Sequence, residues 1–279
     1  MMKVKPRCAL ITGASQGLGK AFAEECAGRG MALVLVALPD TGLHELASLI
    51  RRSSAVAVEV VELDLTAADA SGVLVETLRR RGLVPDLLVN NAGVGFTSRF
   101  GDSRPEQNET TIQLNVAGLV RVTQSVLPFL RGNARSWVLN VASLGAYYPM
   151  PSMPVYSSTK SFILDFSLLL RAELHGSGTA VSVLCPNGIR TNRGARALIE
   201  EQGWAGRLTC QYPDEVARAG LEGVLKDRAV IVPGLANRVL RGLRPLVPRM
   251  LFMRLIARRW GTSSPRQGAI GNRRVEARA

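Results

Sequence analysis

The alternation of short apolar runs with longer segments of helical spacing is the feature that most restricts how this chain can fold. The apolar runs are rich in Val, Leu and Ile and are continuous, which is typical of strands buried on both faces. Seven strands are predicted, at residues 7–12, 31–37, 55–61, 86–90, 136–141, 180–185 and 228–232. Helices are predicted at residues 18–29, 42–52, 67–81, 105–130 and 154–175. The pattern predicts an α/β fold: one doubly wound domain with a seven-stranded parallel sheet, covered by helices on both sides.

The positive charge of the chain is concentrated in its last segment. The formal net charge of the 279 residues is +13, and the segment 235–279 carries +10 of it, with eleven Arg, no Lys and one acid. The remainder is nearly balanced, which argues against a uniformly basic nucleic-acid binder. The four cysteines are scattered without CxxC spacing, and the chain has two histidines. We therefore expect no metal site, no disulfide framework and no His-based triad.

A glycine-rich turn follows the first predicted strand and leads into an Ala-rich helix. Glycine lets the backbone approach a pyrophosphate closely, while free N–H groups and the positive end of the helix dipole face the anion. Glycines also serve ordinary tight turns, but this placement favours dinucleotide binding. The candidate binding residues of this turn are Gly13, Ser15, Gln16, Gly17, Leu18 and Gly19.

Tyr156 and Lys160 are four residues apart at the start of a predicted helix, so they project from one helical face. A free Tyr has a pKa of about 10, and a neighbouring ammonium favours its phenolate. We therefore expect Lys160 to lower the pKa of Tyr156 and to make it a usable proton carrier. Ser143, after the fifth strand, would hydrogen-bond a substrate oxygen. Taken alone, a Tyr–Lys pair at this spacing could equally be an exposed helical pair.

Over about residues 5–235 the chain resembles the short-chain dehydrogenase/reductase family, and within it the hydroxysteroid and 3-oxoacyl reductase-like members. Five features carry the resemblance: the Thr-Gly-x-x-x-Gly-x-Gly turn, Asn90-Asn91-Ala92-Gly93, Asn115, Ser143, and Tyr156-x-x-x-Lys160. The resemblance implies a Rossmann-type domain that binds NAD or NADP and interconverts a secondary alcohol and a ketone. The alternative is a non-catalytic NAD(P)-binding regulator or scaffold of the same fold, which would not need the full Asn–Ser–Tyr–Lys set.

The same resemblance implies a role for each residue. Tyr156 carries the proton, Ser143 stabilises the substrate oxygen, and Lys160 tunes Tyr156 and binds the nicotinamide ribose. Asn115 keeps a water against the lysine. The further cofactor contacts that it implies are Asp64, Leu65, Asn91, Ala92, Gly93, Ile189 and Thr191. Asp64 has an alternative role as a helix N-cap.

Two positions leave questions open. Asn187 stands after Pro186 where the family usually has Gly, and Asn tolerates left-handed backbone well. At the end of the second strand, Leu38 is neither an acid for the ribose 2′-OH of NAD nor a base for the 2′-phosphate of NADP. Asp40 lies further along and is expected to be a turn or cap residue. We therefore expect a slight preference for NADP over NAD.

The segments expected to face the substrate carry few charged residues apart from Arg190, Arg193 and Arg196. In the family, the loop after the sixth strand closes over the substrate, and here it contains Leu198, Ile199 and Trp204. Residues between Ser143 and Tyr156 could line the same pocket or simply pack in the core; they are Tyr147, Tyr148, Met150 and Met153. The composition favours a lipophilic small-molecule substrate, steroid-like or 3-oxoacyl.

We divide the chain into a catalytic domain at 1–234, a basic amphipathic helical extension at 235–260 and a flexible tail at 261–279. The extension either packs on the domain or a partner subunit, or lies on an anionic membrane surface. Packing is favoured, because Arg accounts for 30 of the 35 basic residues chain-wide and so is no special signal in the extension. With no apolar run long enough to span a bilayer and no signal peptide in the sequence, we expect a cytoplasmic location. Contact with nucleic acid is not expected, and the family implies a homodimer or homotetramer.

Overall fold

All seven predicted strands form, and they join in one parallel sheet. The structure is a computed structural model that describes residues 6–148, 150, 152–191, 209–243 and 268–270. The strand order is β3-β2-β1-β4-β6-β7-β8. The strands are β1 (Cys8–Thr12), β2 (Ala32–Ala37), β3 (Val58–Glu62), β4 (Leu87–Asn90), β6 (Ser136–Val141), β7 (Thr179–Leu184) and β8 (Val230–Ile231). The chain runs outward from β1 to β3 and then returns to β4 beside β1, so the carboxyl ends of β1 and β4 flank the switch point where ligands bind in such sheets.

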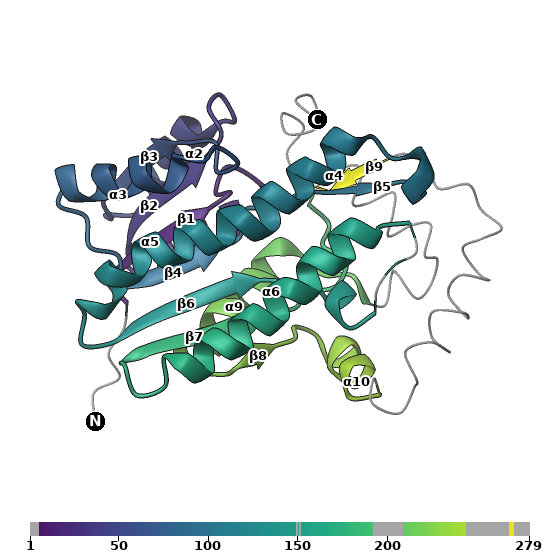
Figure 1. The fold of residues 1–279 in the computed structure, drawn as a ribbon. Helices are drawn as coiled ribbons and strands as arrows, with labels where there is room; N and C mark the ends of the chain where they lie inside the picture. The colour runs from purple at the N-terminus through teal and green to yellow at the C-terminus, as the bar shows by residue number, and fades with distance from the viewer. Residues whose placement is uncertain (1–5, 149, 151, 192–208, 244–267, 271–279) are drawn as a thin grey trace.

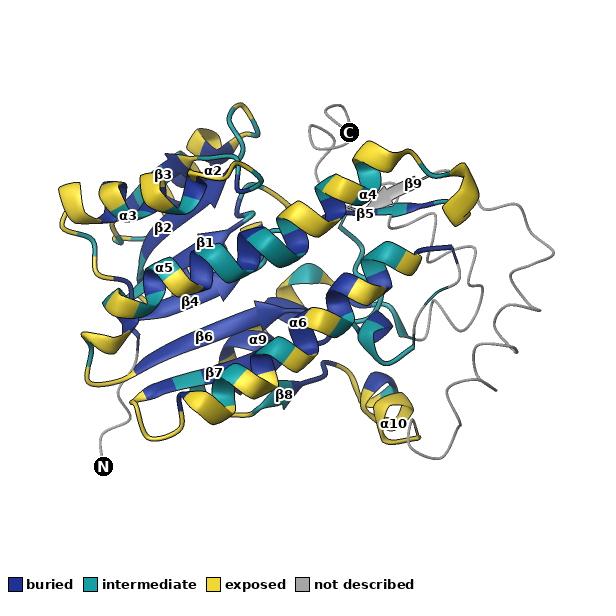
Figure 2. Cartoon of the chain, in the orientation of Figure 1, coloured by how far each residue is buried: buried dark blue, intermediate teal, exposed yellow. Residues whose placement is uncertain are grey.

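Helices cover both faces of the sheet (Figure 1), and the strands between them are almost wholly buried (Figure 2). One apolar cluster joins the sheet to α1 (Gly17–Gly28), α2 (Leu43–Ser53) and α9 (Pro213–Leu225). Clusters on the other face involve α3 (Ala70–Arg80), α5 (Leu119–Arg131) and α6 (Pro154–Glu173). Helix α9 is absent from the predicted helices, although Pro213 at its start and two acids in its first turn are helix-start signals.

The predicted helix over 105–130 forms as three consecutive pieces. It consists of α4 (Pro105–Ile112), a π-helical segment (Gln113–Gly118) and α5. Single π-helical turns inside helices are rare and occur often at functional sites. Here the segment contains Asn115, one of the residues singled out from the sequence.

A chain of buried polar side chains ties the middle of the sheet to α6. Asn90 Nδ2 on β4 donates to Asn140 Oδ1 on β6 at 2.8 Å, and Asn140 Nδ2 donates to Ser167 Oγ on α6 at 2.9 Å. Because unpaired buried amides are costly, these bonds fix the position of α6 relative to the strand ends.

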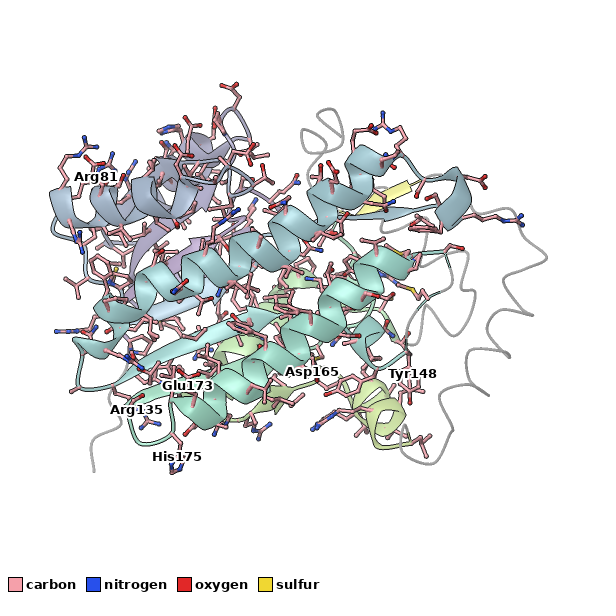
Figure 3. The ribbon with its side chains drawn as sticks, viewed as in Figure 1. Arg81, Arg135, Tyr148, Asp165, Glu173 and His175 are labelled. Carbon is pink, nitrogen blue, oxygen red and sulfur yellow. The ribbon has the colours of Figure 1, made fainter. Side chains whose placement is uncertain are left out.

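The first nine residues of the predicted basic extension form α10 (Leu235–Leu243). The helix packs on the domain: the Tyr148 hydroxyl donates to the Leu240 carbonyl, and the Arg241 guanidinium lies 5.8 Å from the centre of the Tyr147 ring. Figure 3 shows Tyr148 beside α10. These contacts favour packing over a membrane role for residues 235–243; the rest of the predicted extension lies outside the described residues.

Three residues of the segment predicted to be a flexible tail form a strand. Strand β9 (Gly268–Ile270) pairs antiparallel with β5 (Gly95–Thr97), a short strand after the end of β4. The composition of the segment 261–279 does not reveal this strand. Its hydrogen-bond partners are main-chain groups on the edge of β5, about 170 residues away in the chain. The other residues of 261–279 lie outside the described part.

Two buried serine hydroxyls provide a matched test of the polar chain. Ser167→Ala leaves the Asn140 amide without its acceptor and should lower the free energy of unfolding by about 1–3 kcal/mol. Ser182 is equally buried, but within the part of the chain that the structure describes its Oγ has no hydrogen-bond partner. Ser182→Ala should therefore be neutral or slightly stabilising. Urea denaturation of both variants measures the difference, and equal effects would contradict the assigned role of Ser167.

Candidate active site

The glycine-rich turn between β1 and α1 has the shape that close approach of an anion requires. Gly13 and Gly17 adopt φ of 64° and 55°, in the left-handed region that favours glycine. A Cβ on Gly19 would lie 2.0 Å from the Gly13 carbonyl oxygen, so no other residue fits there. Among the described residues, no side chain caps the first turn of α1, which starts after Gln16. Its N–H groups therefore suit a pyrophosphate.

The turn is clamped to the end of β4. Asn91 Nδ2 donates to the carbonyls of Thr12 and Gly13, at 3.0 and 3.1 Å. In return, Thr12 Oγ1 accepts from the N–H groups of Asn91 and Ala92, at 3.0 and 3.1 Å. A Cβ on Gly13 would lie 2.8 Å from Ala92 Cα. Asn91 thus joins the two strand ends, and the small Ala92 permits their close contact.

The loop after β7 faces this turn from the other side. A Cβ on Gly17 would lie 3.1 Å from Thr191 Cγ2, so Thr191 lies against the glycine turn. The expected left-handed backbone at Asn187 is wrong: among the described non-glycine residues, positive φ occurs at Asp40 and Asp227. Asn187 instead uses its side chain, whose Nδ2 donates to Asn237 Oδ1 at 3.3 Å.

Asp64 and Leu65 follow β3. The Asp64 Oδ1 atom accepts from the Thr66 N–H at 3.0 Å and from its hydroxyl at 2.7 Å. This bonding shapes a turn rather than a helix cap, since α3 begins later, after Asp69. Leu65 is buried, and its carbonyl accepts from Arg121 Nη2 at 3.2 Å. Whether the two residues contact an adenine stays a prediction.

Ser143, Tyr156 and Lys160 meet beyond the carboxyl end of β6. Lys160 is buried, and its Nζ donates to the Val141 carbonyl at 2.8 Å, at the last residue of β6. The same Nζ lies 5.7 Å from the centre of the Tyr156 ring, so the two side chains share one face of α6, as predicted. Ser143, two residues after the strand, lies close enough to Tyr156 to lower the pKa of the phenol.

The electrostatic prediction for Tyr156 is wrong in direction. Burial raises the pKa of Tyr156, and the hydrogen bond with Ser143 offsets this only in part. Burial also lowers the pKa of Lys160, from 10.5 to about 8. The sequence spacing gives proximity, but it does not show that both groups are desolvated, which favours the neutral form of each.

Asn115 and Gly93 lie beside the lysine. Asn115 Oδ1 accepts from the Val94 N–H at 2.9 Å, while its Nδ2 donates to the Val94 carbonyl at 2.9 Å and to Thr159 Oγ1 at 3.0 Å. A Cβ on Gly93 would lie 3.1 Å from Asn115 Oδ1 and 3.4 Å from Lys160 Nζ. Because the Asn115 amide is engaged, the water-holding role implied by the family would fall to its main chain, and it stays a prediction.

Gly95 is a site residue that the sequence analysis missed. A Cβ there would lie 2.4 Å from Tyr156 Cδ2, so the phenol ring rests directly on the Gly95 backbone. The available signal was a glycine two residues after the Asn-Asn-Ala-Gly motif. This glycine indicates no function by itself, because its role depends on the packing of Tyr156 against it.

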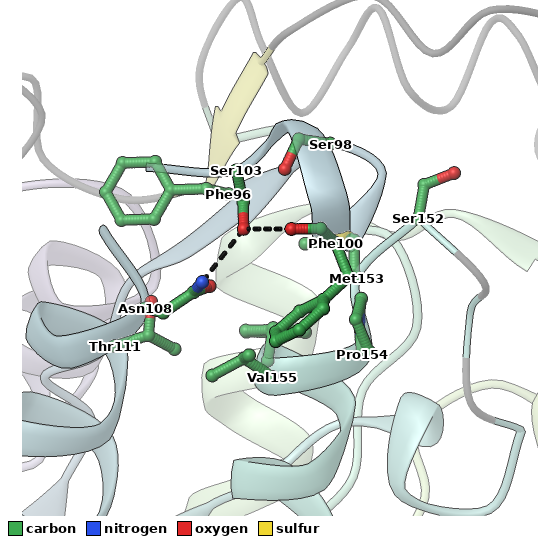
Figure 4. A pocket seen from close by; sticks show the side chains of 11 residues that line it. Phe96, Ser98, Phe100, Ser103, Asn108, Thr111, Ser152, Met153, Pro154 and Val155 are labelled. Atoms are coloured by element: carbon green, nitrogen blue, oxygen red, sulfur yellow. Dashed lines mark hydrogen bonds between the residues drawn. The ribbon is translucent and has the colours of Figure 1, made fainter. Parts of the chain in front are cut away.

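A pocket with Tyr156 in its wall encloses about 250 Å³, counted out to its open side (Figure 4). Its lining residues are Phe96, Ser98, Phe100, Ser103, Asn108, Thr111, Ser152, Met153, Pro154, Val155 and Tyr156. Met153 lines it, which is one of the two alternatives left open by the sequence, whereas Tyr147 and Tyr148 contact α10. The predicted lid residues Leu198, Ile199 and Trp204 lie outside the described residues.

The described residues contain no group of three or more His, Cys, Asp or Glu side chains placed to hold a metal ion. Neither do they contain a helix both long and apolar enough to cross a membrane.

Comparison with known proteins identifies the family. Residues 7–202 match the family model for short chain dehydrogenases. Mouse 17-beta-hydroxysteroid dehydrogenase type 3 is 34% identical over 186 residues, covering 66% of this chain and 60% of the relative. Zebrafish very-long-chain 3-oxoacyl-CoA reductase-B is 33% identical over 187 residues, covering 66% and 60%. The solved structure of a short-chain dehydrogenase from Sphingobium yanoikuyae with NADPH is 34% identical, with a TM-score of 0.74 over 86% of this chain and 94% of the other. This chain therefore belongs to the short-chain dehydrogenase/reductase family and is an NAD(P)-dependent oxidoreductase.

Proposed function

We propose that the protein interconverts a secondary alcohol and a ketone, with Tyr156 as the proton donor and acceptor. The observation that carries the proposal is the convergence of Ser143, Tyr156 and Lys160 beyond β6. The glycine turn and the end of β4, which fit a dinucleotide, lie at the same edge of the sheet. When bound there, the nicotinamide would supply or take up the hydride.

The chemistry of the three side chains follows from their surroundings. Since desolvation raises its pKa, Tyr156 is a neutral phenol near pH 7 and can donate its proton to a carbonyl oxygen. Ser143, which lies beside Tyr156, can donate to the same oxygen and stabilise its developing charge. The Lys160 ammonium would then stabilise the phenolate that remains. Alcohol oxidation reverses these steps and is favoured by higher pH.

A lipophilic substrate is supported by the pocket wall and by the relatives. Phe96, Phe100 and Met153 give the wall much apolar surface. The names of the two relatives indicate a steroid and a very-long-chain 3-oxoacyl-CoA; the steroid skeleton and the long acyl chain are apolar. The pocket is small, so a drug-sized substrate would extend beyond it.

Other sequence predictions remain open. The family membership and the similarity to an NADPH-bound dehydrogenase favour an oxidoreductase over the non-catalytic alternative considered from the sequence. A cytoplasmic location and a homodimer or homotetramer also remain predictions.

Replacing Tyr156 with Phe removes the hydroxyl and keeps the ring that packs on Gly95. We expect kcat for ketone reduction to fall by at least about 10²–10⁴-fold, because proton donation is lost. Cofactor affinity, measured by calorimetry, should be unchanged within about twofold. Turnover close to that of the wild type would defeat the proposed mechanism, and a wild type inactive on a broad ketone panel would favour the scaffold alternative.

Replacing Lys160 with Met removes a buried ammonium and keeps most of the side-chain volume. Near pH 7 the lysine is charged in both the folded and the unfolded chain. Because the ammonium is buried only in the folded chain, only that state bears the desolvation cost, which lowers the pKa of Lys160 from 10.5 to about 8. Allowing for the lost bond to Val141, Lys160→Met should raise the free energy of unfolding by about 1–3 kcal/mol while abolishing turnover.

The stability that Lys160→Met gains over the wild type should depend on pH. Between pH 8 and 10.5 the folded wild type has lost a proton that its unfolded chain still binds, so the free energy of unfolding of the wild type rises with pH. The difference between the variant and the wild type therefore shrinks. Denaturant titrations near pH 7 and pH 10 measure this, with Lys226→Met, an exposed site, as the control. A gain that is the same at both pH values contradicts burial of the charge.

Position 38 should control the choice between NADP and NAD. Leu38 follows β2, and the nearest acid of the neighbouring strand, Glu62, is engaged: its Oε1 accepts from the Asp40 N–H at 3.2 Å. Asp40 is a turn residue, with φ of 53°. Leu38→Arg should improve the NADPH/NADH affinity ratio about tenfold and Leu38→Asp should reduce it about tenfold. Fluorescence titration with both cofactors tests this, and an unchanged ratio in both variants would place ribose recognition elsewhere.

A further inference from the structure

Asn237 is the buried residue of α10, a helix that otherwise exposes most of its surface. Its exposed fraction is 1%. Nδ2 donates to the carbonyl of Pro233 at 3.1 Å, to that of Thr209 at 3.1 Å and to Gln211 Oε1 at 3.3 Å. The inward position of an amphipathic helix normally carries an apolar residue. An amide with this many partners indicates that α10 is attached to a defined polar structure.

That structure is the segment around Gln211, which runs beside the loop after β7. The Gln211 N–H donates to the Gly188 carbonyl at 2.9 Å, and the Arg190 N–H donates to the Gln211 carbonyl at 3.1 Å. Ile189 and Gln211 thereby form an isolated parallel bridge. The loop at 186–191 is thus held along its length by the segment to which Asn237 binds.

Asn237 also reaches this loop directly. Its Oδ1 accepts from Asn187 Nδ2 at 3.3 Å. Asn187 is the residue that replaces the glycine usual in the family, and a glycine there would have no side chain to make this bond. The departure from the family pattern at 187 is therefore matched by a partner in α10.

The loop touches both halves of the active site. On one side the Leu144 N–H donates to the Pro186 carbonyl at 2.7 Å, next to Ser143. On the other side Thr191 lies against Gly17 of the glycine turn. A change in the loop would therefore alter the nicotinamide end of the cofactor site.

Gly234 provides the space in which these amides meet. It precedes α10 with φ of 80°, and a Cβ there would lie 3.2 Å from Gln211 Nε2 and 3.3 Å from Asn237 Nδ2. The turn before α10 thus brings the helix start close to Gln211.

We propose that Asn237 is a positioning residue for the cofactor, acting through Asn187 and Gln211. It holds the loop at 186–191 so that Ile189 and Thr191 lie where the nicotinamide end binds. The inference rests on the cofactor contacts proposed for these two residues, and it makes α10 a structural part of the active site. The adenosine end, bound by the glycine turn and the ends of β2 and β3, does not depend on it.

The test compares two ligands that differ at the nicotinamide end. Calorimetry gives the Kd of NADPH and of 2′-phospho-ADP-ribose, which lacks the nicotinamide, or of NADH and ADP-ribose if the wild type prefers NAD. We expect Asn237→Leu to raise the Kd of the whole cofactor about tenfold and to leave that of the fragment within about twofold. Asn187→Ala, at a less buried site, should raise the Kd of the whole cofactor about threefold.

The double variant tests whether the two residues act together. If Asn187 and Asn237 act through one bond, the double variant should bind no more weakly than Asn237→Leu alone. Ser136→Ala removes a buried hydroxyl that donates to Thr179 Oγ1 at the opposite end of the sheet, and serves as the control for general destabilisation. It should lower the melting temperature and leave both Kd values unchanged.

Three results would overturn the inference: equal weakening of both ligands, unchanged NADPH binding, or additive effects in the double variant. Should Asn237→Leu fail to fold, Asn187→Ala alone distinguishes the first two of these results from the expected one. Binding of the two ligands needs no proton transfer, so failure of this test and failure of the Tyr156 assignment are distinguishable.

Discussion

The hydrogen bond from the Lys160 ammonium to the Val141 carbonyl is the interaction on which the rest of the active site depends. It joins α6 to the last residue of β6 at 2.8 Å. Tyr156 lies one helical turn before the lysine, and Ser143 lies two residues after Val141, so this one bond sets both relative to each other. A charge taken out of water is costly unless it is hydrogen-bonded, and the lowered pKa of Lys160 reflects that cost. The protein thus accepts a destabilising buried ammonium at the place where a phenolate would form.

The shape around this bond is set by residues that carry no side chain. Gly19, Gly93 and Gly95 stand where a Cβ would meet, respectively, the Gly13 carbonyl, the Asn115 and Lys160 head groups, and the Tyr156 ring. The first contact keeps the phosphate-binding turn tight. The other two leave space beside the end of β4 for the side chains of Lys160 and Tyr156. None of these glycines takes part in chemistry, yet alanine at Gly95 would displace the Tyr156 ring, and alanine at Gly93 would crowd the Asn115 and Lys160 head groups.

The sequence predicted what depends on local pattern and missed what depends on distant contacts. Continuous apolar runs predicted every strand of the main sheet, and the i, i+4 spacing placed Tyr156 and Lys160 on one face of α6. The direction of the Tyr156 pKa was wrong, because spacing reveals proximity and not burial. The π-helical segment at Asn115 and the pairing of β9 with β5 could not be predicted, because each involves bonds to residues far away in the chain. The same holds for Asn187, whose partner, Asn237, is 50 residues away.

The contacts of α10 connect the segment after β8 to the candidate active site. The matched family model stops at residue 202, but α10 binds the loop after β7 through Asn237 and the segment between Ser143 and Tyr156 through Tyr148. Those two stretches are the ones expected to face the cofactor and the substrate. A residue whose role is the same for every substrate cannot by itself distinguish one substrate from another. Helix α10 lies beyond the residues matched by the family model and contacts both stretches, so substitutions in it can alter the geometry of loops that the motif residues do not reach.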